Sequence, residues 1–151
     1  MTNRIADLLD GLELFAEFSY VELEVIGRYL NVEDVKGGEA IFREGEPGNF
    51  MMILTAGRIS IYKNSVNGNQ LLSNEVRGRV IGEMALLDSE PRSASCIADG
   101  DCELLVFTQT NLKQLSRDHP GTAYRFMFYL ARMLSKRLRS TSGILVDFLW
   151  H

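Results

Sequence analysis

The sequence predicts an α+β fold in which a barrel or jelly roll of short antiparallel strands is preceded and followed by helices. Apolar residues recur at helical spacing in residues 1–31, and short apolar runs divided by Gly and Pro turns fill residues 32–109. The helical spacing returns in residues 110–151. Many short strands with regular turn signals favour a barrel or jelly roll, and 151 residues suit one domain with its own core.

The N-terminal segment carries the signals of two helical pieces. The apolar residues of its helical stripes are Ile5, Leu8, Leu9, Leu12, Val21, Leu23, Val25, Ile26, Tyr29 and Leu30. Ser19, followed three residues later by Glu22, has the spacing of a capping box. We therefore expect a helix to begin just after Ser19.

The middle segment carries the signals of strands. The run Met51-Met52-Ile53-Leu54 is a candidate buried strand, and Asn67-Gly68 is a strong hairpin signal between Tyr62 and Leu71. Further strands are expected at residues 96–98 and 104–107, on either side of an Asp99-Gly100-Asp101 turn.

The C-terminal segment predicts two helices and an apolar tail. Thr110 is a candidate cap for a short helix, and His119-Pro120-Gly121 ends that helix. A long helix is expected over residues 122–140, with an interruption at Gly143. The tail, residues 144–150, is too apolar to leave in water. We favour a cap that folds back over the base, with a subunit contact and a partner contact as the alternatives.

Composition excludes several function classes. The net charge of −4 argues against a protein that coats nucleic acid, and no apolar run reaches the roughly 18 residues of a membrane span. Cys96 and Cys102 fit no zinc signature, and the sequence holds no nucleophile-elbow, metalloprotease or Walker motif. We expect a cytoplasmic protein that is not an enzyme and uses no metal or cofactor.

Residues 82–95 carry the most specific pattern in the chain. Glu83 follows a glycine, and Arg92 comes nine positions later, next to small hydroxyl residues. A carboxylate accepts hydrogen bonds from sugar hydroxyls, and a guanidinium with backbone N–H groups suits a phosphate. The segment therefore predicts a pocket for a molecule that carries both a ribose and a phosphate.

This segment resembles the phosphate-binding cassette of cyclic nucleotide-binding domains. The resemblance extends over roughly residues 12–140 and is also carried by residues 38–48 and 57–62. It implies a β-roll (a double-stranded β-helix) flanked by N-terminal helices and by C-terminal helices like the family's B and C helices. Ile81 departs from the aromatic residue that many members have at that position. The DNA-binding helix-turn-helix of catabolite-activator-type members does not follow in this sequence.

The resemblance also implies roles for individual residues. Glu83 is expected to bind the ribose 2′-hydroxyl and Arg92 the cyclic phosphate, with the N–H groups of Ala85 and Ala94 as further donors. The full predicted ligand-binding set is Gly82, Glu83, Met84, Ala85, Arg92, Ser93 and Ala94. In the family, a Thr directly after the arginine often accompanies a preference for cGMP, whereas a Ser occurs with either nucleotide. This chain has Ser93 at that position, so cAMP is favoured and cGMP stays open. Tyr129, Arg132, Met133 and Lys136 are candidates for a lid over the base.

Each residue also has an interpretation without a ligand. Glu83 would then be a solvated loop residue, and Arg92 would form a surface ion pair with Asp88 or Glu90. At the level of function, we expect a cyclic-nucleotide receptor that signals to an effector in trans, with a homodimer through the C-terminal helix as a further possibility. The alternatives are a protein–protein interaction module whose pocket is vestigial or holds another ligand, and a ligand-binding piece of a DNA-binding regulator.

Overall fold

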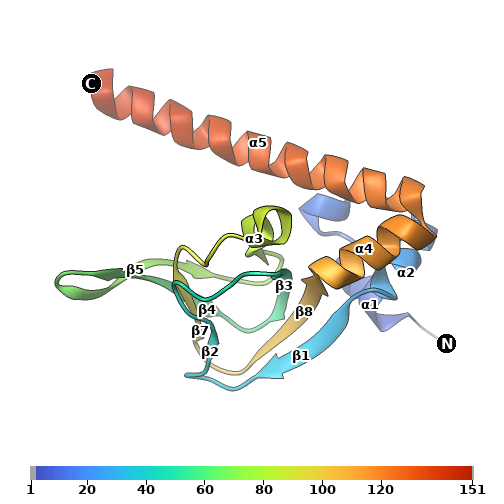
Figure 1. The fold of residues 1–151 in the computed structure, drawn as a ribbon, viewed down its shortest axis with the longest axis horizontal. Helices are drawn as coiled ribbons and strands as arrows, with labels where there is room; N and C mark the ends of the chain where they lie inside the picture. Colours follow the sequence, from blue (N-terminus) through green and yellow to red (C-terminus); the bar gives the residue numbers. More distant parts are fainter. Residues whose placement is uncertain (1–2, 151) are drawn as a thin grey trace. The chain divides into compact units, whose positions relative to one another are not determined.

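The computed structural model describes residues 3–150, with side chains described through residue 143. The chain divides into two compact units, which we call the helical unit (residues 1–26 and 115–151) and the strand unit (residues 27–114). The described strands all lie in the strand unit (Figure 1).

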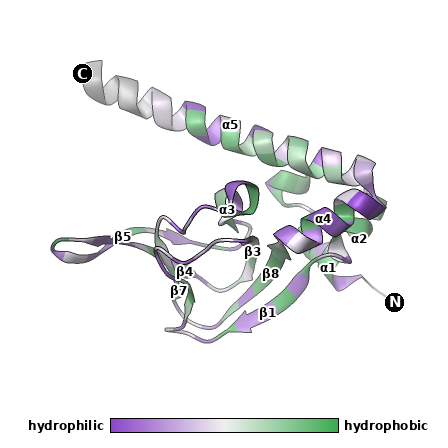
Figure 2. Cartoon of the chain, viewed as in Figure 1, coloured by the Kyte–Doolittle hydropathy of each residue, from purple (hydrophilic) through white to green (hydrophobic). Residues whose placement is uncertain are grey.

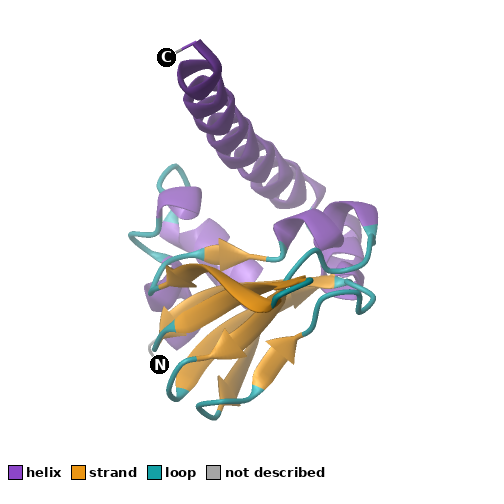
Figure 3. Ribbon diagram, turned by 90° about the vertical axis from the view of Figure 1, so that its left-hand side faces the viewer, coloured by secondary structure: helices purple, strands orange, loops and turns teal. Residues whose placement is uncertain are grey.

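Two four-stranded antiparallel sheets make up the strand unit (Figure 3). The first has the order β1 (Asn31–Val35), β8 (Cys102–Thr108), β3 (Phe50–Ala56) and β6 (Val80–Ile81). The second has the order β2 (Ala40–Phe42), β7 (Ser95–Ala98), β4 (Ile59–Ser65) and β5 (Gly68–Glu75). The predicted α+β fold with an antiparallel β-roll is confirmed.

Alternate residues from both sheets form one apolar core. Met52 and Leu54 of β3 and Leu104 and Val106 of β8 belong to it, as expected for strands whose side chains point alternately to opposite faces. Figure 2 shows β8 as mainly hydrophobic, whereas the end of the β5 hairpin is hydrophilic. The edge strand β5 is exposed along most of its length, so its polar residues suit its position.

The β4–β5 hairpin predicted from Asn67-Gly68 is confirmed, with Val66 and Asn67 as its two turn residues. Ser65 pairs with Gly68, and the Ser65 hydroxyl donates a hydrogen bond of 2.7 Å to the Gly68 carbonyl. Gly68 has a φ of +102°, which a residue with a Cβ rarely adopts. The glycine therefore fixes where the chain reverses.

The helical unit comprises α1 (Arg4–Leu9), η1 (Glu13–Phe15), most of α2 (Tyr20–Gly27) and α5 (Pro120–Trp150). The predicted capping box is confirmed, because the Ser19 N–H donates to the Glu22 carboxylate at 3.0 Å and the Glu22 N–H donates to the Ser19 hydroxyl at 3.2 Å. The guanidinium of Arg125 on α5 binds Glu22 at 2.8 Å. Helices distant in the sequence are thus joined within this unit.

Two boundary predictions for the C-terminal helices are wrong. The residue that caps α4 (Gln109–Asp118) is Thr108 and not Thr110. The Asn111 N–H donates to the Thr108 hydroxyl at 3.0 Å, and the Thr108 N–H donates to the Asn111 side-chain oxygen at 3.2 Å. The helix α5 also continues past Gly143, since a single glycine weakens a helix but keeps the backbone N–H that continues it. The predicted break at Pro120 is confirmed.

The side chains of the apolar tail, residues 144–150, lie outside the described residues. Within the part of the chain that the structure describes, no helix combines the length and the apolarity that crossing a membrane requires.

Candidate functional site

Residues 82–94 connect β6 to β7 and contain the short helix α3 (Glu83–Asp88). Gly82 precedes the helix with a φ of +80°, and a Cβ at this position would lie 2.5 Å from Nη1 of Arg92. Only glycine combines that backbone conformation with that close approach. At the other end of α3, the Gln109 side chain donates to the carbonyls of Ala85 at 3.3 Å and Leu86 at 3.1 Å. The predicted helical turn is therefore anchored at both ends.

Arg92 is the central charged group of the site. Its side chain is only 5% exposed. Nη1 donates to the Gly82 carbonyl at 3.2 Å, and Nη2 donates to the Phe50 carbonyl at 2.7 Å. The guanidinium also lies over two aromatic rings, 4.2 Å from the centre of Phe42 and 4.5 Å from that of Phe50. Arg92 is thus not the surface residue of an ion pair with Asp88 or Glu90, and that interpretation is wrong.

The hydrogen bonding of Arg92 is incomplete. A guanidinium has five N–H donors, and the Nε donor of Arg92 is buried without a hydrogen-bond partner. Burial lowers the pKa of Arg92, against the opposing effect of neighbouring groups that include Glu46 and Glu83. A buried cation that keeps unused donors is costly unless an anion joins it.

Glu83, in the first turn of α3, is also buried. Its side chain is 8% exposed, so the interpretation as a solvated loop residue is wrong. A buried carboxylate in the wall of a cavity is rare unless it has a specific partner. The site therefore contains both of the charged groups that the sequence singled out, and both are largely removed from water.

A cavity of about 470 Å³ joins these residues. It is lined by Phe42, Ile61, Ile81, Gly82, Glu83, Met84, Ala85, Asp88, Glu90, Pro91, Arg92, Ser93 and Ala94. All seven residues of the predicted ligand-binding set are among them. The fold thus brings the whole set around one cavity, while the role of each residue toward a ligand remains a prediction.

Sequence reasoning missed the groups that hold Arg92 from distant strands. Phe42 ends β2 and Phe50 begins β3, and neither ring was expected to contact Arg92. Gly48 was also missed: a Cβ there would lie 2.4 Å from the Cβ of Ala85 and 3.1 Å from Nε of Arg92. The local sequence could not reveal these contacts, because they join segments that are distant in the sequence: Arg92 lies 42 residues from Phe50 and farther still from Phe42.

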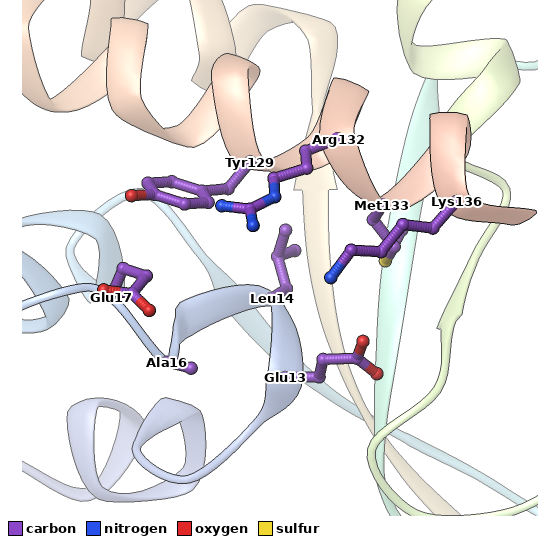
Figure 4. A pocket seen from close by; sticks show the side chains of 8 residues that line it. All are labelled: Glu13, Leu14, Ala16, Glu17, Tyr129, Arg132, Met133 and Lys136. Carbon is purple, nitrogen blue, oxygen red and sulfur yellow. The ribbon is translucent and has the colours of Figure 1, made fainter.

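The four lid candidates lie on α5 and line a second cavity, inside the helical unit. This cavity measures about 150 Å³ and is lined by Glu13, Leu14, Ala16, Glu17, Tyr129, Arg132, Met133 and Lys136. Figure 4 shows the side chains of Arg132 and Lys136 extending from α5 toward the segment that carries Glu13 and Glu17. The role of the four residues as a lid over a base stays a prediction.

Comparison with known proteins identifies the family. Residues 32–119 match the model of the cyclic nucleotide-binding domain, which covers more than half of the chain. This protein therefore belongs to the cyclic nucleotide-binding domain family. The matched range includes both sheets except the first residue of β1, and the whole of the 82–94 segment.

Relatives and solved structures agree with this assignment. The Cyclic AMP receptor protein of Thermus thermophilus is 30% identical over 87% of this chain and 59% of its own length. A cAMP-dependent protein kinase regulatory subunit of Aspergillus niger is 31% identical over 71% of this chain and 26% of its own length. A crystal structure of a cyclic nucleotide-binding domain from Methylobacillus flagellatus superposes with a TM-score of 0.81 at 26% identity, over 95% of this chain and 81% of that one.

The chain matches only part of these curated relatives. It spans 59% of the length of the Thermus thermophilus protein and 26% of that of the Aspergillus niger protein. Another relative is an enzyme, Lysophospholipase NTE1 of Chaetomium globosum, which is 26% identical over 93% of this chain but only 8% of its own length. The shared region is thus a module that occurs in regulators and in an enzyme.

Proposed function

We propose that this chain is a receptor for a cyclic mononucleotide, with cAMP favoured over cGMP. The observation that carries the proposal is a buried arginine with unused donors, Arg92, in the wall of a cavity that also contains the buried carboxylate of Glu83. The names of two relatives, a Cyclic AMP receptor protein and a cAMP-dependent protein kinase regulatory subunit, support cAMP.

The two charged groups divide the ligand between them. Arg92 neutralises the single negative charge of the cyclic phosphate, and the backbone N–H groups of Ala85 and Ala94 donate to the phosphate oxygens. Glu83 accepts a hydrogen bond from the ribose 2′-hydroxyl. The apolar side chains of Ile61 and Met84, which line the same cavity, give the purine a surface to pack on.

Calorimetric titration tests the proposal. We expect heat of binding with cAMP, weaker binding with cGMP, and little or none with 5′-AMP, whose ring-opened phosphate carries a second charge that one guanidinium does not neutralise. 2′-Deoxy-cAMP should bind more weakly than cAMP, because it lacks the hydroxyl that donates to the Glu83 carboxylate. The proposal fails if neither cyclic nucleotide produces heat at high micromolar concentration.

We propose further that the signal leaves through α5 to an effector protein in trans in the cytoplasm, and that the chain itself performs no catalysis. Exposed apolar side chains on α5 support a protein contact there. Tyr124, Phe128 and Leu138 are 69%, 50% and 68% exposed, and the first two rings stack at 6.3 Å. Their spacing puts all three on one side of the helix.

We propose that a second copy of the chain occupies this face of α5 and that the effector contacts the resulting dimer. Light scattering coupled to size-exclusion chromatography should give a dimer mass for the wild type and a monomer mass for Phe128→Glu combined with Leu138→Glu. A monomer mass for the wild type, unchanged by the two substitutions, would exclude the dimer.

A further inference from the structure

Backbone hydrogen bonds join the end of the 82–94 segment to the turn that follows β2. The Gly45 N–H donates to the Arg92 carbonyl at 2.8 Å, and the Arg92 N–H donates to the Glu46 carbonyl at 2.8 Å. Further along, the Glu44 N–H donates to the Ser95 hydroxyl at 2.9 Å. These bonds fix residues on either side of the Ser93–Ala94 peptide but not that peptide itself.

Lys63 on β4 holds the Ser93–Ala94 peptide. Its ammonium donates to the Ser93 carbonyl at 2.7 Å and binds one carboxylate oxygen of Glu44 at 2.8 Å. The other carboxylate oxygen of Glu44 accepts the N–H of Asn64 at 2.8 Å. The Lys63 ammonium is therefore fixed between a carboxylate and a single backbone carbonyl.

Glu44 is charged under ordinary conditions. The hydrogen bond from Lys63, together with that from the Asn64 N–H, lowers the pKa of Glu44 below its usual value. The carboxylate thus keeps its negative charge and its hold on the ammonium across the neutral pH range.

The geometry of a peptide bond links this contact to the cavity. The C=O of Ser93 and the N–H of Ala94 belong to one planar unit, and no described peptide bond is cis, so the two groups point in opposite directions. Fixing the carbonyl oxygen on Lys63 therefore also fixes the direction of the Ala94 N–H. Both Ser93 and Ala94 line the cavity.

We propose that Lys63, held by Glu44, is a positioning residue that aims the Ala94 N–H at one oxygen of the bound cyclic phosphate. The inference rests on the proposed function, because it needs a phosphate in this cavity. Lys63 does not itself touch the ligand in this account. Lys63 acts by orienting the Ser93–Ala94 peptide, so it influences the hydrogen bond to only one of the two exocyclic phosphate oxygens.

The experiment measures dissociation constants for cAMP and for its two phosphorothioate diastereomers, in which sulfur replaces one or the other exocyclic oxygen. The wild type should discriminate between the diastereomers, since Arg92 and the Ala94 N–H serve different oxygens. In Lys63→Met, cAMP should bind about tenfold more weakly and the discrimination should change by a similar factor, as expected for losing one hydrogen bond to a charged group. Lys63→Arg should stay within about threefold of the wild type, because it keeps the charge and the donors.

Two controls separate positioning from charge and from folding. Lys36→Met removes the same charge from a lysine that lines a different cavity, and it should leave all three constants unchanged. The amide resonance of Ala94 should shift on addition of cAMP in the wild type and shift less in Lys63→Met. A thermal midpoint close to that of the wild type is expected for Lys63→Met, because exposed ion pairs add little stability.

Three results would overturn the inference while leaving the proposed function intact. One is unchanged cAMP affinity in Lys63→Met. Another is an equal loss of affinity for cAMP and for both diastereomers in Lys63→Met, because an equal loss would indicate a general electrostatic or structural effect. The last is the same loss in Lys36→Met. Failure of the wild type to bind any cyclic nucleotide would instead refute the proposed function, and the inference with it.

Discussion

Replacing Arg92 by Met separates its role toward a ligand from its role in folding. Arg92 is 5% exposed, so little water reaches a phosphate bound beside it. In the Arg92→Met variant this phosphate would lose its counter-charge without gaining solvation in return. Removing one partner of a buried charge pair costs about 3–5 kcal/mol. At about 1.4 kcal/mol for each tenfold, the affinity for cAMP should fall by about two to four orders of magnitude.

The same substitution should change the stability of the free protein much less. It removes two hydrogen bonds from a charged donor, to the carbonyls of Gly82 and Phe50, each contributing about 1.5–3 kcal/mol. It also removes the desolvation cost of a buried charge with an unpaired Nε, for which we take the gain of about 1–4 kcal/mol that is typical when buried ion pairs are replaced by apolar side chains. These effects oppose each other, and their central values leave a net destabilisation of about 2 kcal/mol, or a fall of about 4–8 °C in the thermal midpoint.

Titration calorimetry and thermal unfolding without ligand provide the two measurements. Arg58→Met is the matched control, because Arg58 is 56% exposed and pairs with Asp99 at 2.7 Å on the surface of the same unit. It should leave the affinity unchanged. An affinity loss of less than about fivefold in Arg92→Met would refute the reasoning, and so would a loss of affinity that only accompanies unfolding of the free protein.

Further predictions follow from other contacts. Gly48→Ala should destabilise the protein by about 1–3 kcal/mol through overpacking, since its Cβ would lie 2.4 Å from that of Ala85; Gly121→Ala, with open space at the Cβ, should be tolerated in the same denaturation assay. Burial alone would raise the pKa of Glu22, but the Ser19 N–H and a neighbouring arginine lower it, so its stabilising effect should be present above about pH 4.5 and be lost as the pH falls through the lowered pKa. Urea midpoints should therefore decline less on acidification in Glu22→Gln than in the wild type, and an equal decline would contradict this. Burial also raises the pKa of Cys96 to about 12, so this thiol should not react with a disulfide reagent at pH 8 until the protein is denatured. Rapid reaction of Cys96 in the native protein would contradict this prediction.

The sequence was sufficient wherever the structural cause is local. The Ser19–Glu22 capping box and the hairpin predicted from Asn67-Gly68 each depend on a few adjacent residues. Gly143 shows the limit of such reasoning, because a helix that is otherwise favourable continues through one unfavourable residue. A local signal therefore predicts a boundary well only when the surrounding residues agree with it.

The candidate site was predictable only in part. The resemblance located Glu83 and Arg92 because a family pattern fixes their spacing, and the structure then brought them to one cavity. The rings of Phe42 and Phe50 beneath the guanidinium come from other strands, and no feature of their neighbouring residues distinguishes them from ordinary core aromatics. Such contacts depend on the register of the sheets, which the sequence alone leaves open.

The central claim is that the buried charge of Arg92 is compensated by the phosphate of a cyclic nucleotide. A crystal structure of the protein grown with cAMP tests it most directly. We predict a phosphate oxygen at about 2.7–2.9 Å from a guanidinium nitrogen of Arg92, with the ribose 2′-hydroxyl on the Glu83 carboxylate. Two results would contradict this claim. One is a nucleotide bound elsewhere on the protein. The other is an empty cavity at saturating cAMP, with Arg92 still hydrogen-bonded to the carbonyls of Gly82 and Phe50.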